Sequence, residues 1–367
     1  MRGKDTFPII SLQYIFYYLN PLFSAFLVFS TDFKNIHIML SRLLLTSTFL
    51  FFTILSSAQT DTGKPFNTKL LKLSNKIYSY EGKGGNVGLS IGDDGIFMVD
   101  SQFAESIPEF FEDTKKFNKS VRFLVNTHYH EDHTGGNLDM AKAGAVIVSQ
   151  ENTRKRLQGE IKKETKKMSP QILPTITFSD ELTFYFNNEK IQILHLPNAH
   201  TDGDAVVYFT ESNVLHTGDL FFNGNYPYID LQSGGGVKGY IGGMSRLMDL
   251  IDKNTKIIPG HGPNASYNDL EESMNMLSNT FKQVMQLEAL GKTEDEVAKM
   301  KNLTEPYDAK GYGKGFVKTE DFLRTLYKDV VSRQTDKLSR IEENEKAQKE
   351  YDRIKKEHDA KKAKKKE

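Results

Sequence analysis

The stretch THYHEDHTGGN, residues Thr127 to Asn137, gathers three histidines and two acidic residues in a segment as short as one loop. Four of its side chains are potential metal ligands at relative positions i, i+2, i+4 and i+5: His128, His130, Asp132 and His133. The preceding run VRFLVN is typical of a buried strand, so the cluster falls where a strand passes into a loop. Loops at strand ends commonly carry functional residues, and this spacing can bring the four side chains to one point. The stretch therefore predicts a metal site.

The composition restricts the metals and partners that the chain can bind. The chain of 367 residues has no cysteine, which excludes disulfides, iron-sulfur clusters and Cys-ligated zinc and leaves nitrogen and oxygen ligands. Imidazole suits zinc, copper, iron and nickel, and carboxylates suit harder ions, so a mixed set predicts zinc, with iron and manganese as alternatives. The 48 basic and 48 acidic residues balance, which argues against a nucleic-acid partner. A small molecule is the predicted partner, and no oligomeric state is indicated.

Three further residues downstream complete a larger ligand set. His200 in LPNAHTDGD, Asp219 in LHTGDLFF and His261 in IIPGHGP each follow a β-type run and adjoin a turn-forming residue. A catalytic zinc normally takes three protein ligands and a water, so the four residues of the first stretch already indicate a second ion. The total of five histidines and two aspartates divides into two sets of three terminal ligands and one shared carboxylate. Two ions about 3.5–4 Å apart can hold a bridging hydroxide and polarise a carbonyl or phosphoryl oxygen, so this inventory is typical of a dinuclear hydrolase.

The rest of the chain alternates between β-type and helical patterns, which predicts a mixed α/β domain with a helical C-terminal addition. The predicted strands lie within residues 76–100, 121–126, 145–149, 182–196, 205–209, 213–219 and 256–260. The predicted helices lie near residues 105–117, 138–143, 151–167, 237–251, 267–290, 294–301 and 319–331. Within 182–196 the pattern predicts a hairpin that turns at Asn187 and Asn188.

Apolar segments dominate the N-terminus and are expected to lie outside the folded domain. From Met39 the run MLSRLLLTSTFLFFTILSSAQ has a basic residue, an apolar core and small residues before Gln59, which is typical of a secretory signal peptide at 39–58. Residues 1–38 are interpreted as an upstream segment included by a misassigned start codon, with a hairpin of two membrane helices as the alternative. The expected protein is periplasmic or secreted, without stable membrane association once the signal is removed; the alternative is a membrane anchor formed by these segments. The remaining predicted divisions are a domain at 66–265, C-terminal helices at 266–335 and a charged tail at 336–367, expected to be a solvated helix or disordered.

Four segments together resemble the successive metal motifs of the metallo-β-lactamase superfamily: THYHEDHTGGN, HTDGDAVVYF, HTGDLFF and IIPGHG. The resemblance covers about residues 70–265, and its HxHxDH pattern is highly specific. It implies a four-layer αββα sandwich with two metals at one edge of the sheets. It also implies a ligand set in which His128, His130 and His200 bind the first metal, Asp132, His133 and His261 bind the second, and Asp219 bridges them.

Asp219 separates the branches of this family. Metallo-β-lactamases usually have cysteine or serine at this position, whereas hydroxyacylglutathione hydrolases and many other hydrolases of the family have a bridging aspartate. The segment LFFNGNYPYIDLQSGGGVKGYIGGMSRLMDLI also resembles family members of unassigned substrate, including cyclase-like and SoxH-like ones. The C-terminal helices lack the basic cluster expected to hold glutathione. The resemblance therefore leaves the substrate open.

The resulting hypothesis is an exported dinuclear zinc hydrolase of a small ester, thioester, lactone or amide, in which Asp132 and Asp219 orient a metal-bound hydroxide. The predicted substrate-binding residues follow Asp219 along the chain: Asn223, Tyr226, Tyr228 and Lys238. A β-lactamase is the main alternative, which Asp219 opposes. A flavo-diiron oxidoreductase is opposed by the lack of a flavin-domain pattern, and a non-catalytic zinc-binding protein also stays open.

Overall fold

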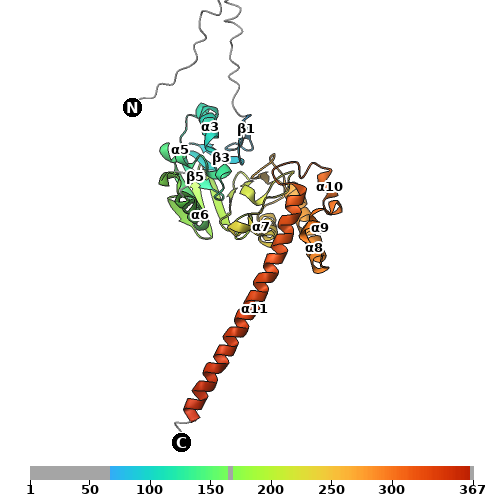
Figure 1. The fold of residues 1–367 in the computed structure, drawn as a ribbon. Coiled ribbons are helices and arrows are strands. Elements are labelled where there is room, and N and C mark those ends of the chain that lie inside the picture. The colour runs from blue at the N-terminus through green and yellow to red at the C-terminus, as the bar shows by residue number, and fades with distance from the viewer. Residues whose placement is uncertain (1–66, 164–167, 364–367) are drawn as a thin grey trace, which may run out of the picture. The chain divides into compact units, whose positions relative to one another are not determined.

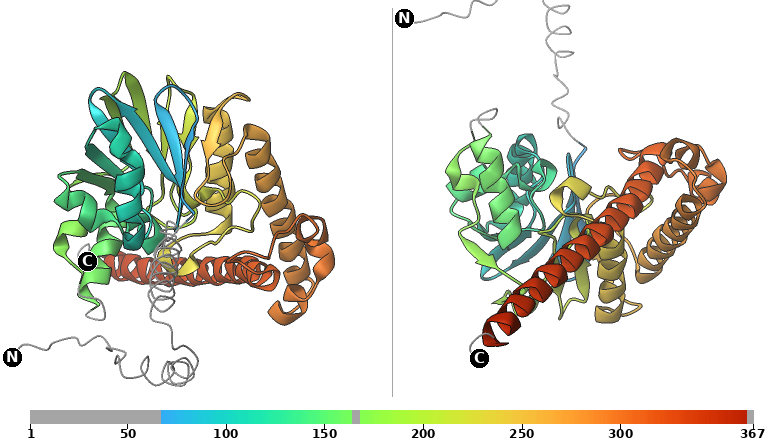
Figure 2. Two further views of the ribbon diagram at one scale, coloured as in Figure 1. Left: turned by 90° about the horizontal axis from the view of Figure 1, so that it is seen from above. Right: turned by 60° about the horizontal axis from the view of Figure 1, so that its bottom comes forward.

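Two β-sheets packed face to face form the centre of the fold (Figure 1). The computed structural model describes residues 67–163 and 168–363, so the segments 1–38 and 39–58, interpreted above as an upstream segment and a signal peptide, lie outside the described residues. Helices cover the outer face of each sheet, which gives four layers in the order αββα (Figure 2). The predicted fold class is therefore confirmed.

The first sheet has seven strands that follow the order of the chain. They are β1 (Lys69–Lys72), β2 (Ile77–Glu81), β3 (Val87–Gly92), β4 (Gly95–Val99), β5 (Val121–Asn126), β6 (Val146–Gln150) and β7 (Ile176–Phe178). Neighbours from β1 to β4 are antiparallel, and neighbours from β4 to β7 are parallel. Parallel strands need crossover connections, which are supplied by helices α3 (Ile107–Thr114), α5 (Asn137–Lys142) and α6 (Glu151–Lys162).

The second sheet has five strands in the order β12-β11-β10-β9-β8. Their bounds are β8 (Glu181–Phe186), β9 (Glu189–His195), β10 (Ala205–Phe209), β11 (Val214–His216) and β12 (Lys256–Ile258). Neighbours from β8 to β11 are antiparallel, while β11 and β12 are parallel and connected through α7 (Val237–Leu250). The β8–β9 hairpin turns at Asn187 and Asn188, as predicted, and both residues have the positive φ that a tight hairpin turn requires.

The strands alternate their apolar side chains between two layers, because successive residues of a strand point to opposite faces. In β4, Phe97 and Val99 lie in the hydrophobic cluster between the sheets. Ile96 and Met98 lie in the cluster on the outer face, together with Phe110 of α3. Both faces of such a strand are buried, which explains why its sequence is a continuous apolar run.

The C-terminal helices cover the outer face of the second sheet together with α7. They are α8 (Tyr267–Ala289), α9 (Glu294–Ala298), α10 (Glu305–Asp308) and α11 (Thr319–Ala363). Helix α7 packs against α8, and both α8 and α9 pack against α11 (Figure 1). Phe281 of α8 and Phe322 of α11 share one hydrophobic cluster with Val206 of β10 and Tyr240 of α7. Residues 266–335 therefore contribute to the core of the sandwich itself.

Short 3-10 helices occur at several connections: η1 (Ala104–Ser106), η2 (Lys115–Phe117), η3 (Pro170–Ile172), η4 (Gly218–Leu220), η5 (Leu231–Ser233) and η6 (Lys301–Leu303). The edge strands β1 and β7 have no counterpart among the predicted strands. The helix predicted at 319–331 continues as α11 to Ala363, and the side chains at residues 345–351 are exposed. Among residues 67–163 and 168–363, no helix combines the length and the apolar character that crossing a membrane requires.

Candidate metal centre

The predicted metal ligands meet at the edge of the sandwich where strands of both sheets end. His128 and His130 follow β5, and His133 lies in the short helix α4 (Glu131–Thr134). His200 lies in the loop between β9 and β10, Asp219 lies in η4 after β11, and His261 follows β12. The backbone N–H of Ala205 donates to the carbonyl oxygen of Thr127 at 2.7 Å, which joins the two sheets at this edge. Residues far apart in the sequence thereby form one site.

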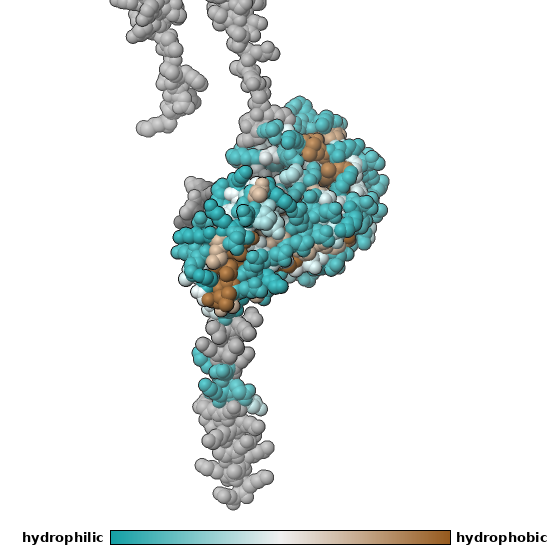
Figure 3. Space-filling view, turned by 90° about the vertical axis from the view of Figure 1, so that its right-hand side faces the viewer, coloured by the Kyte–Doolittle hydropathy of each residue, from teal (hydrophilic) through white to brown (hydrophobic). Residues whose placement is uncertain are grey.

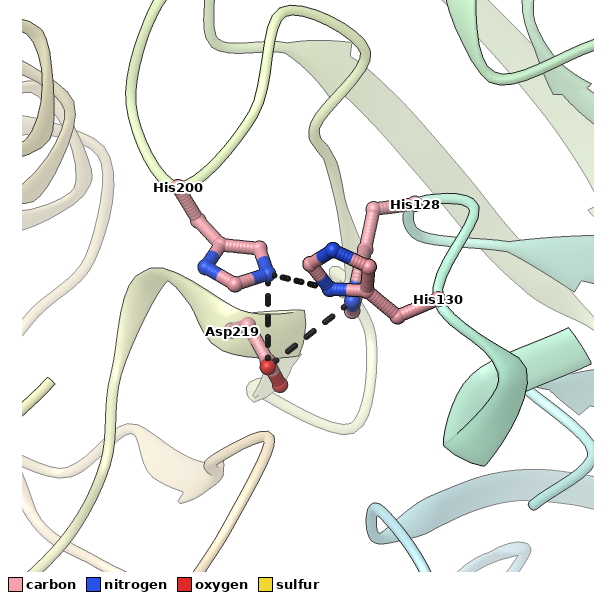
Figure 4. Close-up of side chains that lie close together, drawn as sticks. All are labelled: His128, His130, His200 and Asp219. Carbon is pink, nitrogen blue, oxygen red and sulfur yellow. Dashed lines mark hydrogen bonds and ion pairs between the residues drawn. The ribbon is translucent and has the colours of Figure 1, made fainter. Parts of the chain in front are cut away.

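The first group contains three imidazoles and one carboxylate: His128, His130, His200 and Asp219 (Figure 4). Their facing atoms all lie within 4.8 Å of one another. His200 Nε2 lies 2.9 Å from His130 Nδ1 and 3.5 Å from Asp219 Oδ2. His128 Nε2 lies 3.8 Å from the same carboxylate oxygen. This arrangement of one oxygen and three nitrogens suits a zinc-sized ion.

The second group contains Asp132, His133 and His261. His133 Nε2 lies 3.4 Å from His261 Nε2 and 3.6 Å from Asp132 Oδ2. The other oxygen of Asp219, Oδ1, lies 3.0 Å from His133 Nε2 and 3.4 Å from His261 Nε2. One carboxylate thus directs Oδ2 to the first group and Oδ1 to the second, which is the geometry of a bridging ligand.

Unsatisfied buried atoms provide a test of whether this donor set fits metal ions. Within the described residues, His128 Nε2 and Asp219 Oδ1 are buried and make no hydrogen bond, although Asp219 Oδ1 lies within ion-pair distance of His133. Buried polar atoms without a partner are rare and cost free energy. Each of these two atoms faces one of the two groups, so a cation in each group would satisfy both. The residues therefore fit a pair of metal ions.

The electrostatics of the two groups differ. Burial lowers the pKa of His128 well below its ordinary value and lowers the pKa of His200 to about 4, so both imidazoles are held in the neutral form that binds metals. Burial acts in the same direction on His133 and His261, but Asp219 and other nearby carboxylates outweigh it. They raise the pKa of His133 well above its ordinary value and that of His261 to about 9. The second group therefore favours positive charge, which a divalent cation would supply.

Asp100 fixes one of these imidazoles and was missed in the sequence. Its Oδ2 accepts a hydrogen bond from His133 Nδ1 at 2.8 Å, and its carboxylate also accepts from the backbone N–H and hydroxyl of Thr127, both at 2.7 Å. Asp100 has a φ of 63°, a conformation that non-glycine residues rarely adopt. Its position directly after the apolar run of β4 is the same strand-end signal that identified the other motifs. A carboxylate on the second ring nitrogen orients a metal-binding histidine and raises its basicity.

Asp230 orients an imidazole of the first group, that of His130. Its Oδ2 lies 3.1 Å from His130 Nε2 and accepts a hydrogen bond from the Tyr129 hydroxyl at 3.1 Å. Its Oδ1 accepts from the backbone N–H groups of Gln232 and Ser233, which fixes the carboxylate. This contact leaves His130 Nδ1 free to face His200. Neither its spacing nor its neighbours marked Asp230 in the sequence.

Replacing Asp230 with alanine should weaken zinc binding by about 10- to 100-fold, the usual effect of losing a carboxylate that orients a metal-binding histidine. Competition with a chromophoric chelator measures the dissociation constant. The matched control is Asp93→Ala, because Asp93 is fully exposed in the β3–β4 turn. Equal zinc affinity of Asp230→Ala and wild type would contradict the role given to Asp230.

The four predicted substrate-binding residues have different positions. Tyr228 is partly exposed, and its ring centroid lies 5.8 Å from that of His200 and 5.9 Å from that of His130. Asn223 adjoins the site through its backbone, where its N–H donates to the His261 carbonyl at 2.9 Å. Lys238 is exposed in the first turn of α7, and its role stays a prediction.

Tyr226, the remaining residue predicted to bind substrate, lies in the core instead. Tyr226 is 1% exposed, its ring stacks on Phe322 with centroids 4.3 Å apart, and its hydroxyl donates to Asp308 Oδ1 at 2.8 Å. Tyr226 and Tyr228 are close in sequence, but the backbone turns one toward the C-terminal helices and the other toward the imidazoles. Tyr226 therefore belongs to the core.

Replacing Tyr226 with alanine should lower the free energy of unfolding by about 3–5 kcal/mol, the usual cost of removing a buried aromatic ring. Tyr226→Phe keeps the ring and should cost about 1 kcal/mol through the lost hydrogen bond. Urea unfolding measures both values. The core assignment is contradicted if Tyr226→Phe leaves stability unchanged and instead raises KM.

A family model described as the metallo-beta-lactamase superfamily matches residues 80–268. The hydroxyacylglutathione hydrolase of Pelagibacter ubique is 28% identical over 127 residues, which cover 34% of this chain and 46% of that protein. The hydroxyacylglutathione hydrolase of a Synechococcus species is 31% identical over 129 residues, covering 35% and 44% respectively. The chain thus spans less than half the length of these relatives. A metallo-beta-lactamase structure from Pontibacter korlensis aligns with a TM-score of 0.49 and 20% identity, covering 58% of this chain and 100% of that one.

Proposed function

Because this chain belongs to the metallo-β-lactamase superfamily, we propose that it is a dinuclear zinc hydrolase of a small ester, thioester, lactone or amide. The observation that carries the proposal is Asp219, whose two oxygens face two separate groups of potential ligands. The similarity of the chain to two hydroxyacylglutathione hydrolases supports the assignment as a hydrolase. A β-lactam substrate is disfavoured, because metallo-β-lactamases usually have cysteine or serine where this chain has Asp219.

The roles of the residues follow from the two groups. His128, His130 and His200 would hold one ion, Asp132, His133 and His261 would hold the other, and Asp219 would hold both. When bound, such a pair supplies an activated water as nucleophile and a Lewis acid for the substrate carbonyl. Asp100 and Asp230 keep His133 and His130 in the orientation that directs the remaining ring nitrogen to the metals.

A panel of chromogenic substrates tests this proposal. Zinc-loaded protein should hydrolyse at least one ester, thioester, lactone or amide, and a chelator should abolish the activity until zinc is restored. Turnover chiefly of the β-lactam nitrocefin would favour the β-lactamase alternative. No turnover of any compound by protein that retains both zinc ions would favour a non-catalytic zinc-binding protein.

We further propose that the protein is exported through a signal peptide at residues 39–58. The support is the sequence pattern alone, since these residues lie outside the described ones. Expression in a bacterial host followed by N-terminal sequencing provides the test. A mature protein beginning near Gln59 is expected, and retention of Met1 in the purified protein would contradict export.

A further inference from the structure

Two aromatic side chains, Tyr228 and Phe316, extend outward from the imidazoles of the predicted metal ligands. We call these two residues the aromatic strip. The Tyr228 ring contacts the rings of His130 and His200, and its backbone carbonyl accepts a hydrogen bond from His200 Nδ1 at 2.8 Å. On its other side the Tyr228 ring meets Phe316 edge to face, with centroids 5.6 Å apart and the planes at 76°. The strip therefore begins at the metal centre and continues to the surface.

Phe316 is 84% exposed, more than any other large hydrophobic residue whose side-chain exposure the structure describes. The face that carries the C-terminal helices is otherwise mainly hydrophilic, with hydrophobic residues gathered in small patches (Figure 3). Leu290 and Tyr185 are each 80% exposed, and single exposed apolar residues of this kind are common. Phe316 is distinguished by its ring contact with a residue that itself contacts two predicted metal ligands.

The loop that carries Phe316 is held in place at both ends. Asp308 at the end of α10 accepts hydrogen bonds from the hydroxyls of Tyr226 and Thr319, at 2.8 and 2.7 Å. The ammonium group of Lys318 donates to the carbonyl oxygen of Gly315 at 2.8 Å. Gly315 also packs so closely on Asn225 that an added Cβ would lie 2.6 Å from its side-chain oxygen. The loop is therefore fixed beside the segment that carries Tyr228, and Phe316 is presented at a defined position.

We propose that Tyr228 and Phe316 form one wall of an apolar subsite that binds the aromatic or long aliphatic acyl group of the substrate. This inference rests on the proposed function, because it places the carbonyl to be hydrolysed at the metal centre. An acyl group attached to that carbonyl can extend along the strip and cover the exposed face of Phe316. Aromatic rings bind apolar groups by burying surface that is otherwise hydrated. The substrate class is thereby narrowed to hydrophobic acyl compounds.

Selectivity among esters tests this wall directly. The quantity to compare is the kcat/KM for a phenylacetyl ester divided by the kcat/KM for the acetyl ester of the same phenol. In Phe316→Ala this ratio should fall about tenfold, which is the loss expected for one partly buried aromatic contact. Phe316→Tyr should restore most of the ratio. Leu290→Ala is the matched control, because it removes a similarly exposed apolar side chain directly after α8, and it should leave the ratio unchanged. An unchanged ratio in Phe316→Ala would overturn the proposal.

Ligand binding provides a readout that does not depend on turnover. The chain has no tryptophan, so the variant F316W carries a single indole whose fluorescence reports on its surroundings. With zinc-loaded protein, a phenylpropyl hydroxamate should shift this emission, whereas acetohydroxamate, which has the same chelating head and no apolar tail, should not. The emission of L290W should respond to neither compound.

Equal responses of F316W to the two hydroxamates, or no response to either, would overturn the subsite whether or not esters are hydrolysed. Hydrolysis of esters together with an unresponsive F316W would leave the proposed function standing and remove only this inference. A responsive F316W in a protein that hydrolyses no ester, thioester, lactone or amide would support the subsite and contradict the proposed function.

Discussion

Replacing Asp219 with alanine should lower kcat/KM for the best substrate by about 1000-fold or more, because loss of metal-assisted charge stabilisation removes several kcal/mol from the transition state. The two oxygens of Asp219 lie 3.0–3.8 Å from ring nitrogens of four histidines, two in each group. No other carboxylate among the described residues that form the two groups faces both of them. The variant should therefore bind fewer metal ions as well as lose activity.

The matched control for this substitution is Asp249→Ala, because Asp249 is exposed on α7. Steady-state kinetics and elemental analysis should be run on the same preparations, with circular dichroism to show that both variants are folded. Asp249→Ala should behave as wild type. Full activity of Asp219→Ala, or two tightly bound ions in it, would contradict the bridging role.

Replacing Gly85 with alanine, which adds a single methyl group, should lower activity by about 100-fold. A displacement of a catalytic-site residue by about 1 Å can have an effect of this size. A Cβ built on Gly85 would lie 2.2 Å from Cε1 and 2.4 Å from Nε2 of His133. His133 has no space to move, because it is fully buried and its other nitrogen is bound to Asp100. The Gly85 backbone is also fixed, since its N–H donates to the Asp132 carbonyl and its carbonyl accepts from Gln102. Gly85→Ala should therefore displace His133 and weaken binding of the second ion.

Gly242→Ala provides the comparison for Gly85→Ala. Gly242 lies in α7, and a Cβ there would meet no atom within 4 Å. Alanine is favoured over glycine in a helix by about 1 kcal/mol, so this variant should be slightly more stable and fully active. Kinetics, zinc affinity and thermal unfolding distinguish the two variants. Normal zinc binding and turnover by Gly85→Ala would show that His133 is not confined as the structure indicates.

Local patterns predicted the mixed α/β domain and the clustered side chains, whereas the four-layer αββα order was implied by the family resemblance. The buried strands appear as continuous apolar runs, and the seven side chains lie in the segments that follow β5, β9, β11 and β12. The grouping of these seven side chains in space agrees with the ligand sets that the family resemblance implied. Their role as ligands stays a proposal.

The supporting residues could not be predicted equally well, because their partners are distant in the chain. Asp230 meets His130 across 100 residues, and no local pattern marks that contact. Closeness to Asp219 in sequence also misassigned Tyr226, which faces the core, while Phe316 was overlooked although its ring touches Tyr228. Asp100 is the exception, since its place directly after β4 could have identified it. Sequence proximity predicts a shared loop but not which way its side chains point.

The zinc content of the purified wild-type protein tests the central claim most directly. Elemental analysis should be made after zinc loading and exhaustive dialysis against metal-free buffer, with the protein concentration determined by amino-acid analysis. Two groups of ligands joined by Asp219 predict two zinc ions per chain. A content of one ion or none per chain would contradict the dinuclear centre.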